Sequence, residues 1–95
     1  MKQLTRRLLI KGRVQGVGFR WALQDKALQL GLNGWVRNLR DGRVEALVCG
    51  DTLSVETLTA WAYQGPPMAY VEEVLCNDDF EDQCDETGFG VLSSR

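Results

Sequence analysis

The order in which strand-like and helical periodicities follow one another along the chain is the strongest constraint on its fold. The segment 4–13 alternates apolar and basic side chains, which is typical of a strand. Apolar residues then recur at helical spacing over 19–30 and again over 51–64. The other strand-like segments are 32–38, 43–50, 70–76 and a short one at 89–92.

This order predicts two split strand–helix–strand units. Such units form an antiparallel sheet with both helices on one face, the α+β ferredoxin-like two-layer sandwich. The sheet has four strands, or five if 89–92 joins it. Because the chain has 95 residues and no low-complexity linker, we expect a single domain over 1–95. The fold alone predicts no activity, since ferredoxin-like domains have many functions.

Turn and cap residues stand at the expected ends of these segments. Gly31 is a C-terminal stop for the first helix. Asp41 and Gly42 form the dipeptide that favours a hairpin turn between the second and third strands. The second helix has three candidate N-cap residues, Asp51, Thr52 and Ser54.

Charge is distributed unevenly along the chain. The net charge is −2, yet residues 1–43 carry ten Lys or Arg and two acids, whereas 44–95 carry one Arg and eleven acids. The overall acidity argues against a general nucleic-acid binder, and the basic half can either bind a small anion or pair with the acidic half. The acidic segment 77–87 is predicted to be a solvated loop, because its spacing does not follow a calcium-binding template.

The chain has no histidine and three cysteines. Without histidine the usual general base is missing, so any catalysis must rest on charge, positioning or carboxylates. Cys49, Cys76 and Cys84 lack the spacing of a zinc site, so no metal is expected; free thiols are expected, and a disulfide between two of them stays open. No segment has the length of a signal peptide or a bilayer span, so we expect a cytoplasmic protein without membrane contact.

The loop between the first strand and the first helix has the composition of an anion-binding site. Gly16 and Gly18 allow the backbone to approach a ligand closely. The first N–H groups of a helix are unpaired and its dipole favours negative charge there, and Arg20 adds a guanidinium suited to phosphate oxygens. The spacing is neither that of a Walker A loop nor that of a dinucleotide-binding loop. Glycines alone would be typical of any tight turn, so the other residues of the motif must decide whether the loop binds an anion.

Two segments resemble the signatures of the acylphosphatases, small enzymes that hydrolyse carboxyl-phosphate anhydrides. The first is Ile10–Arg20, IKGRVQGVGFR, and the second is Gly34–Gly50, GWVRNLRDGRVEALVCG. The similarity covers nearly the whole chain and is weakest over 77–87. It implies the ferredoxin-like fold, no metal or organic cofactor, and catalysis by one arginine and one asparagine, which by position are Arg20 and Asn38.

Acylphosphatase chemistry agrees with the types of residue present. A small acyl phosphate, such as acetyl, carbamoyl or aminoacyl phosphate, is the expected substrate, and inorganic phosphate is the expected product and inhibitor. We expect Arg20 and the backbone amides of the loop to hold the phosphoryl group, and Asn38 to orient a water for in-line attack. The predicted phosphate-binding residues are Gln15, Gly16, Val17, Gly18, Phe19 and Arg20. The side chains of Val17 and Phe19 are expected to anchor the loop to the core, and the protein is expected to be a monomer.

Two other functions are weighed against this one. The alternative is a non-catalytic regulatory module that binds phosphate or carbamoyl phosphate, resembling the acylphosphatase-like domain of carbamoyl-phosphate-using maturation proteins. A ferredoxin-like nucleic-acid binder is disfavoured, because the strands lack the stacking aromatics of such domains and the chain is acidic overall. Arg13, Arg37, Arg40 and Arg43 are expected to be solvated charges without a catalytic role.

Overall fold

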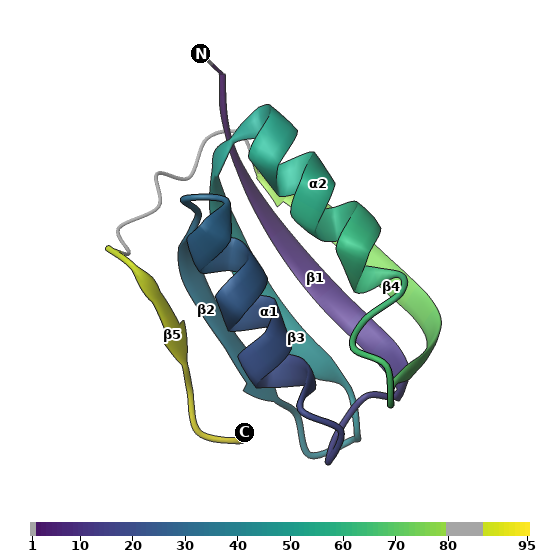
Figure 1. Cartoon of the computed structure of the whole chain (residues 1–95). Coiled ribbons are helices and arrows are strands. Elements are labelled where there is room, and N and C mark those ends of the chain that lie inside the picture. The colour runs from purple at the N-terminus through teal and green to yellow at the C-terminus, as the bar shows by residue number, and fades with distance from the viewer. Residues whose placement is uncertain (1, 80–86) are drawn as a thin grey trace.

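The computed structural model describes residues 2–79 and 87–95 and consists of a sheet with two helices on one of its faces (Figure 1). The strands are β1 (Gln3–Arg13), β2 (Asn33–Asn38), β3 (Val44–Asp51), β4 (Tyr70–Asp79) and β5 (Phe89–Val91). The helices are α1 (Phe19–Gln29) and α2 (Thr52–Ala62). This element order and layering confirm the predicted α+β ferredoxin-like sandwich. Neither described helix has the length and hydropathy that a membrane span requires.

The sheet has the strand order β4-β1-β3-β2-β5. Its first four strands are antiparallel to their neighbours, as predicted. β5 instead pairs in parallel with β2, with Gly34 opposite Phe89, so the expectation of a purely antiparallel sheet is wrong. Both β5 and β2 run in the direction opposite to β4. Because β5 joins the sheet next to β2, at the edge far from β4, these two neighbours are parallel.

The core lies between the helices and the sheet. Leu8 and Ile10, two alternate residues of β1, face the helices and are fully buried. The helices contribute the buried stripes Phe19, Leu23 and Ala27, and Val55, Leu58, Thr59 and Ala62. Burying each large apolar side chain contributes about 1.5–3 kcal/mol, so this packing fixes both helices on the sheet.

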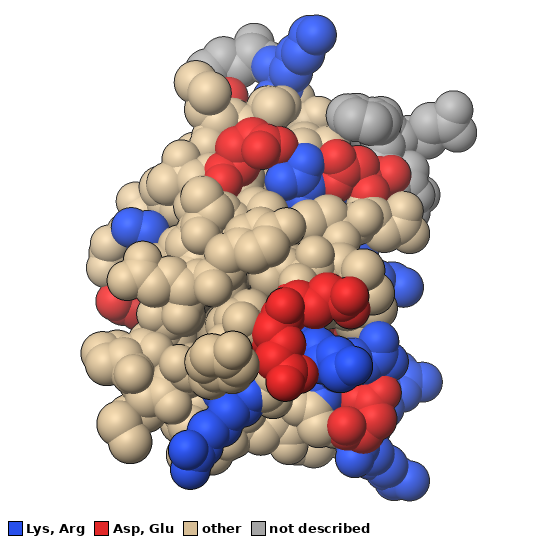
Figure 2. All heavy atoms as spheres, turned by 90° about the vertical axis from the view of Figure 1, so that its right-hand side faces the viewer, with Lys and Arg blue, Asp and Glu red and all other residues tan. Residues whose placement is uncertain are grey.

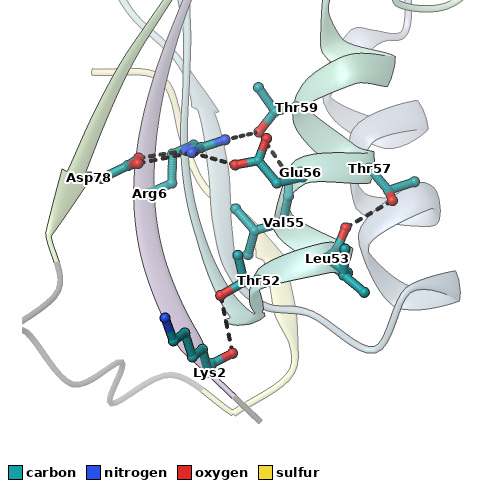
Figure 3. Close-up of polar contacts among 9 residues, drawn as sticks. All are labelled: Lys2, Arg6, Thr52, Leu53, Val55, Glu56, Thr57, Thr59 and Asp78. Carbon is teal, nitrogen blue, oxygen red and sulfur yellow. Dashed lines mark hydrogen bonds and ion pairs between the residues drawn. The ribbon is translucent and has the colours of Figure 1, made fainter.

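The ends of the helices agree only partly with the cap residues expected from the sequence. Helix α1 ends at Gln29, and Gly31 takes a φ of 71°, the left-handed conformation of a C-terminal stop. Asp51 is the N-cap of α2 but makes no capping hydrogen bond through its side chain. The Thr52 hydroxyl donates instead to the carbonyl of Lys2 at 3.2 Å (Figure 3). The start of α2 is therefore tied to the residue before β1 rather than held by a side-chain cap.

Arg6 links β1, β4 and α2 beneath the helix layer (Figure 3). Its guanidinium donates two hydrogen bonds to Asp78, at 2.5 and 2.9 Å, one to Glu56 at 2.7 Å and one to the Thr59 hydroxyl at 3.0 Å. The Arg6 side chain is 10% exposed, so these bonds satisfy a charge that water barely reaches. The hydrogen bonds from Arg6 lower the pKa of Asp78, while partial burial opposes that change.

The acidic segment differs from the expected loop in its described part. Residues 77–79 belong to β4 and pair with β1, so the expectation of a loop is wrong there. The physical reason is the partner strand, since Asn77 and Asp78 lie opposite Arg7 and Arg6. The remainder of the expected loop, residues 80–86 including Cys84, lies outside the described residues.

Ion pairs between the two halves of the chain account for part of the charge asymmetry. Arg6 pairs with Glu56 and Asp78, and Arg37 pairs with Glu45 at 2.6 Å. On the face that carries α2 and β4, acidic and basic side chains adjoin one another (Figure 2). Among the described residues, part of the basic first half therefore pairs with the acidic second half, and arginines outside these pairs are available for an anion.

Candidate active site

The sheet topology brings the β1–α1 loop and the β2–β3 turn to the same end of the molecule (Figure 1). Val44 is the shared neighbour, since it pairs with Ile10 of β1 on one side and with Asn38 of β2 on the other. Asn38 lies two residues from the fully buried Val36, on the face of β2 that the helices cover. The sheet register therefore places the Asn38 side chain beneath the start of α1.

The loop that precedes α1 presents bare backbone. Gly16 and Gly18 have φ angles of 74° and 77°, a left-handed conformation that only glycine adopts without strain. No heavy atom lies within 4 Å of the position a Cβ would take at either glycine. Gly18 is the N-cap of α1, and no acidic residue occupies the first turn. The positive end of the helix dipole thus faces an open space without a protein carboxylate from that turn.

Both ends of the loop are fixed in the core. Val14 and Phe19 are each 1% exposed, and the Phe19 ring lies 5.5 Å from the Trp61 ring, centroid to centroid. Val17 is partly buried against the same core. The expectation that Val17 and Phe19 anchor the loop is confirmed, and the anchors hold the glycines between them in a defined conformation.

A pocket of about 210 Å³ opens between the loop, the first turn of α1 and the end of β2. Its walls are formed by Val14, Gly16, Gly18, Phe19, Arg20, Trp21 and Asn38. The structure thus brings Arg20 and Asn38, which are 18 positions apart in the sequence, to one cavity. Gln15 and Val17, predicted with them, do not line it. Trp21 lines the pocket although it was not predicted to do so. Its position directly after Arg20, in the first helical turn, was the feature of the sequence that could have indicated this.

The two polar side chains of this pocket have unused hydrogen-bonding capacity. Within residues 2–79 and 87–95, Arg20 forms no ion pair and no side-chain hydrogen bond, in contrast to Arg6, Arg37 and Arg43. The Asn38 Oδ1 atom is buried and has no hydrogen-bond partner among the same residues. A buried acceptor without a partner costs about 1–3 kcal/mol, which a ligand or water at this place would recover.

The Gln15 side chain turns to the neighbouring hairpin. Its Nε2 donates to the carbonyl of Leu39 at 2.7 Å and to that of Arg43 at 3.0 Å. These two residues also close the turn, because the N–H of Leu39 donates to the carbonyl of Arg43 at 2.8 Å. Sequence reasoning missed this contact, since nothing in the chain signals where a glutamine of a glycine-rich loop will point.

Charge pairing also holds the β2–β3 turn. The Arg43 side chain and backbone N–H both donate to the carboxylate of Asp41, at 2.9 and 3.0 Å. These hydrogen bonds lower the pKa of Asp41 and raise that of Arg43. Both charges are therefore retained near neutral pH, and Arg43 is directed to the turn rather than to the pocket.

A larger hollow of about 490 Å³ lies over the sheet face opposite the helices. Its charged lining mixes the basic Lys11 and Arg43 with the acidic Asp41, Glu72 and Glu73. Because its charges oppose one another, it lacks the positive surroundings that a phosphate requires. The smaller pocket has the better chemistry for an anion despite its smaller volume.

Other chemistries find little support among the described residues. No group of three or more metal-ligating side chains comes together there. Cys76 carries a free thiol, and burial raises its pKa, which disfavours the nucleophilic thiolate. The arrangement can bind an anion and orient a neutral reactant beside it.

Fold and site together define a small α+β domain with a pocket at a helix N-terminus, lined by an arginine and a carboxamide, whose chemistry suits an anion. The sequence profile of the acylphosphatases matches residues 6–91. An acylphosphatase of Thermococcus kodakarensis is 57% identical over 74 residues, which are 78% of this chain and 81% of that protein. The chain belongs to the acylphosphatase family.

Solved structures agree with this assignment. The crystal structure of an acylphosphatase from Bacillus subtilis superposes with a TM-score of 0.90 at 32% identity, over 94% of this chain and 98% of that one. An acylphosphatase from Coxiella burnetii gives a TM-score of 0.87 at 36% identity, over 96% and 94% of the two chains. The protein is an acylphosphatase, an enzyme of the hydrolase class, and the comparisons support this function rather than the non-catalytic module.

Proposed function

We propose that the pocket between the β1–α1 loop and Asn38 is the active site, and that a small acyl phosphate binds there with its phosphoryl group against the loop. Backbone N–H groups over 15–20 donate to the phosphoryl oxygens, and the Arg20 guanidinium donates charge-assisted hydrogen bonds to the same group. Each charge-assisted bond contributes about 1.5–3 kcal/mol. These donors also stabilise the charge of the transition state, which is spread over the equatorial oxygens.

Asn38 orients the attacking water in this proposal. Its Oδ1 accepts a hydrogen bond from the water, so that the lone pair of the water oxygen is directed at phosphorus. Half a turn of the amide exchanges Oδ1 and Nδ2, so either atom can face the pocket. A neutral carboxamide is no strong base, so it contributes position rather than proton removal.

The reaction then balances without a general base from the protein. The water oxygen forms a bond to phosphorus while the bond between phosphorus and the carboxylate oxygen breaks. The carboxylate leaves with the electron pair, and the water proton passes to a phosphoryl oxygen or to solvent. The products are the carboxylate and inorganic phosphate.

One observation carries the proposal: a guanidinium without a protein partner, a buried amide oxygen without a partner and two open glycines lie around one small cavity. A purely structural pocket would not explain why the buried Asn38 Oδ1 has no partner there, because buried polar groups are usually paired.

Hydrolysis of benzoyl phosphate by the parent protein, Arg20→Ala and Asn38→Ala tests these roles. We expect Asn38→Ala to lower kcat by about 100-fold or more, and Arg20→Ala to impair both substrate binding and rate. Arg20→Lys keeps the charge but loses the planar fork, so it should recover only part of the activity. Arg40→Ala is the matched control, because Arg40 is an exposed arginine of the nearby turn that does not line the pocket.

Turnover of Arg20→Ala or Asn38→Ala at the parent rate would place the active site elsewhere. A loss in Arg40→Ala equal to that in Arg20→Ala would mean that general positive charge, not a specific guanidinium, is what matters. Turnover should also persist in a chelator, since the proposed steps use no metal.

We further propose that inorganic phosphate binds the empty site as a competitive inhibitor. It should raise the melting temperature of the parent protein and leave that of Arg20→Ala nearly unchanged, because a ligand that binds only the folded state stabilises it. A monomeric state, testable by sedimentation equilibrium, and a cytoplasmic location, testable by fractionation, remain predictions for this protein.

A further inference from the structure

Gln15 links the two parts of the proposed site through its side chain. Its Nε2 donates one hydrogen bond to the carbonyl of Leu39, at 2.7 Å, and one to the carbonyl of Arg43, at 3.0 Å. Leu39 follows Asn38 directly in the chain, and Arg43 lies on the other side of the same turn. The Gln15 amide thus connects the β1–α1 loop to the β2–β3 turn, which follows Asn38.

No other side-chain hydrogen bond or ion pair among the described residues makes this connection. The loop is fixed at its ends by the buried Val14 and Phe19, which belong to the core and not to the turn. The turn is held within itself, by the Arg43 and Asp41 pair and by the hydrogen bond between the Leu39 N–H and the Arg43 carbonyl. Each part would therefore keep its own conformation without Gln15, and Gln15 ties them together directly, in addition to the sheet register that they share through Val44.

We propose that Gln15 is a positioning residue: its side chain fixes the distance between the phosphate-binding loop and the Asn38 amide, so that the water and the phosphorus atom are aligned for in-line attack. The inference rests on the proposed roles of the loop and of Asn38. It assigns the Gln15 side chain a specific role beyond the phosphate binding expected of the loop. A half-buried amide with both of its N–H groups donated to carbonyls is held rigidly, as such a spacer requires.

The prediction is a change in kcat with little change in phosphate affinity. Gln15→Met keeps the length of the side chain but removes both donors, and Gln15→Asn keeps the donors on a chain one methylene shorter. For both we expect kcat with benzoyl phosphate to fall about 10- to 100-fold, because small misplacements of reacting groups have effects of this size. The inhibition constant of inorganic phosphate should change less than about threefold, since the loop keeps its core anchors.

Gln24 provides the matched control. Its Nε2 donates to the carbonyl of Phe89 at 2.8 Å and so ties α1 to β5, away from the pocket. Gln24→Met removes the same kind of hydrogen bond and should lower the melting temperature to a similar extent, yet leave kcat within about twofold of the parent value. If loss of stability alone lowered kcat, Gln24→Met would show it as well.

A double-mutant cycle separates the inference from the function on which it rests. If Gln15 acts through Asn38, Gln15→Met should lower kcat less than about threefold further in the Asn38→Ala background. The positioning role would be overturned if the fold-losses in kcat of Gln15→Met and Asn38→Ala multiplied in the double variant. It would also be overturned if both Gln15 variants kept kcat within about threefold of the parent value. Full activity of Asn38→Ala itself would instead overturn the proposed function.

Discussion

Removing Asp78 should destabilise the fold more than any other single change in the Arg6 cluster. Asp78→Ala deletes two hydrogen bonds to the Arg6 guanidinium, of 2.5 and 2.9 Å, and leaves a cation that is 10% exposed. Breaking a fully buried pair costs about 3–5 kcal/mol, but the Asp78 side chain is 27% exposed, so water recovers part of this. We expect a loss of about 2–3 kcal/mol, equivalent to a melting temperature lower by roughly 10–20 °C in a chain of this size.

The other members of the cluster rank below Asp78. Glu56 contributes one hydrogen bond and its side chain is 54% exposed, so Glu56→Ala should cost at most about 1 kcal/mol. Arg6→Met replaces the guanidinium by an apolar chain of similar length and frees both carboxylates to meet water, at a cost of about 1 kcal/mol. The double variant Arg6→Met/Asp78→Ala should then be more stable than Asp78→Ala alone, because it no longer holds a buried guanidinium whose one remaining carboxylate partner is the exposed Glu56.

Urea unfolding of these variants gives the free energies, and the same measurement at lower pH tests the cause. The hydrogen bonds from Arg6 lower the pKa of Asp78 in the folded state below its unfolded value of about 3.9. The stabilisation is therefore complete above about pH 4 and is lost as the pH falls through the lower folded-state pKa. Equal losses in Asp78→Ala and Glu56→Ala at neutral pH would refute this reasoning. So would a stability gap between the parent and Asp78→Asn that does not shrink as the pH is lowered from about 4.

Two further predictions concern the pocket. Gly18→Ala should weaken inhibition by phosphate and lower the free energy of unfolding by about 1–2 kcal/mol, because alanine is strained at a φ of 77° even though space is free there. Gly31→Ala is the control, since Gly31 has a φ of 71° and equal space. It should show the same loss of stability in thermal unfolding without the change in phosphate inhibition. Trp21→Ala should reduce kcat/KM for benzoyl phosphate by about 2- to 10-fold and kcat/KM for acetyl phosphate by less than about twofold. The reason is that Trp21 is 61% exposed at the pocket, where its ring can stack with an aromatic acyl group but not with an acetyl group. Equal reductions for the two substrates would contradict a contact between Trp21 and the acyl group.

Local sequence patterns were sufficient for most of the fold. The alternation over 4–13 and the helical spacing from Phe19 to Ala27 report burial directly, because each apolar side chain must face the same core. Gly31 and Gly42 likewise mark chain reversals through their own backbone preferences. These features depend on neighbours within a few residues, and such information is present in the sequence itself.

Long-range pairing was not predictable in the same way. The extension of β4 to Asp79 depends on β1 lying alongside it, and Arg6, 72 positions away, gives Asp78 a partner that no local spacing reveals. The parallel position of β5 depends on which sheet edge is free. For the candidate site, Arg20 and Asn38 came from a motif match, whereas the direction of the Gln15 side chain depends on a turn 24 positions later in the chain.

The first turn of the helix that carries Arg20 has electrostatics that do not favour its own stability. A cation near a helix N-terminus opposes the helix dipole, and the first turn of α1 contains no acid to offset it. Arg6, Arg37 and Arg43 each have a carboxylate partner, whereas Arg20 has none within the described parts of the chain. In the proposed function, a bound phosphoryl dianion would supply this negative charge to the guanidinium, the helix dipole and the loop amides at once. In the proposed site, this uncompensated positive charge is therefore a source of affinity for the phosphoryl group.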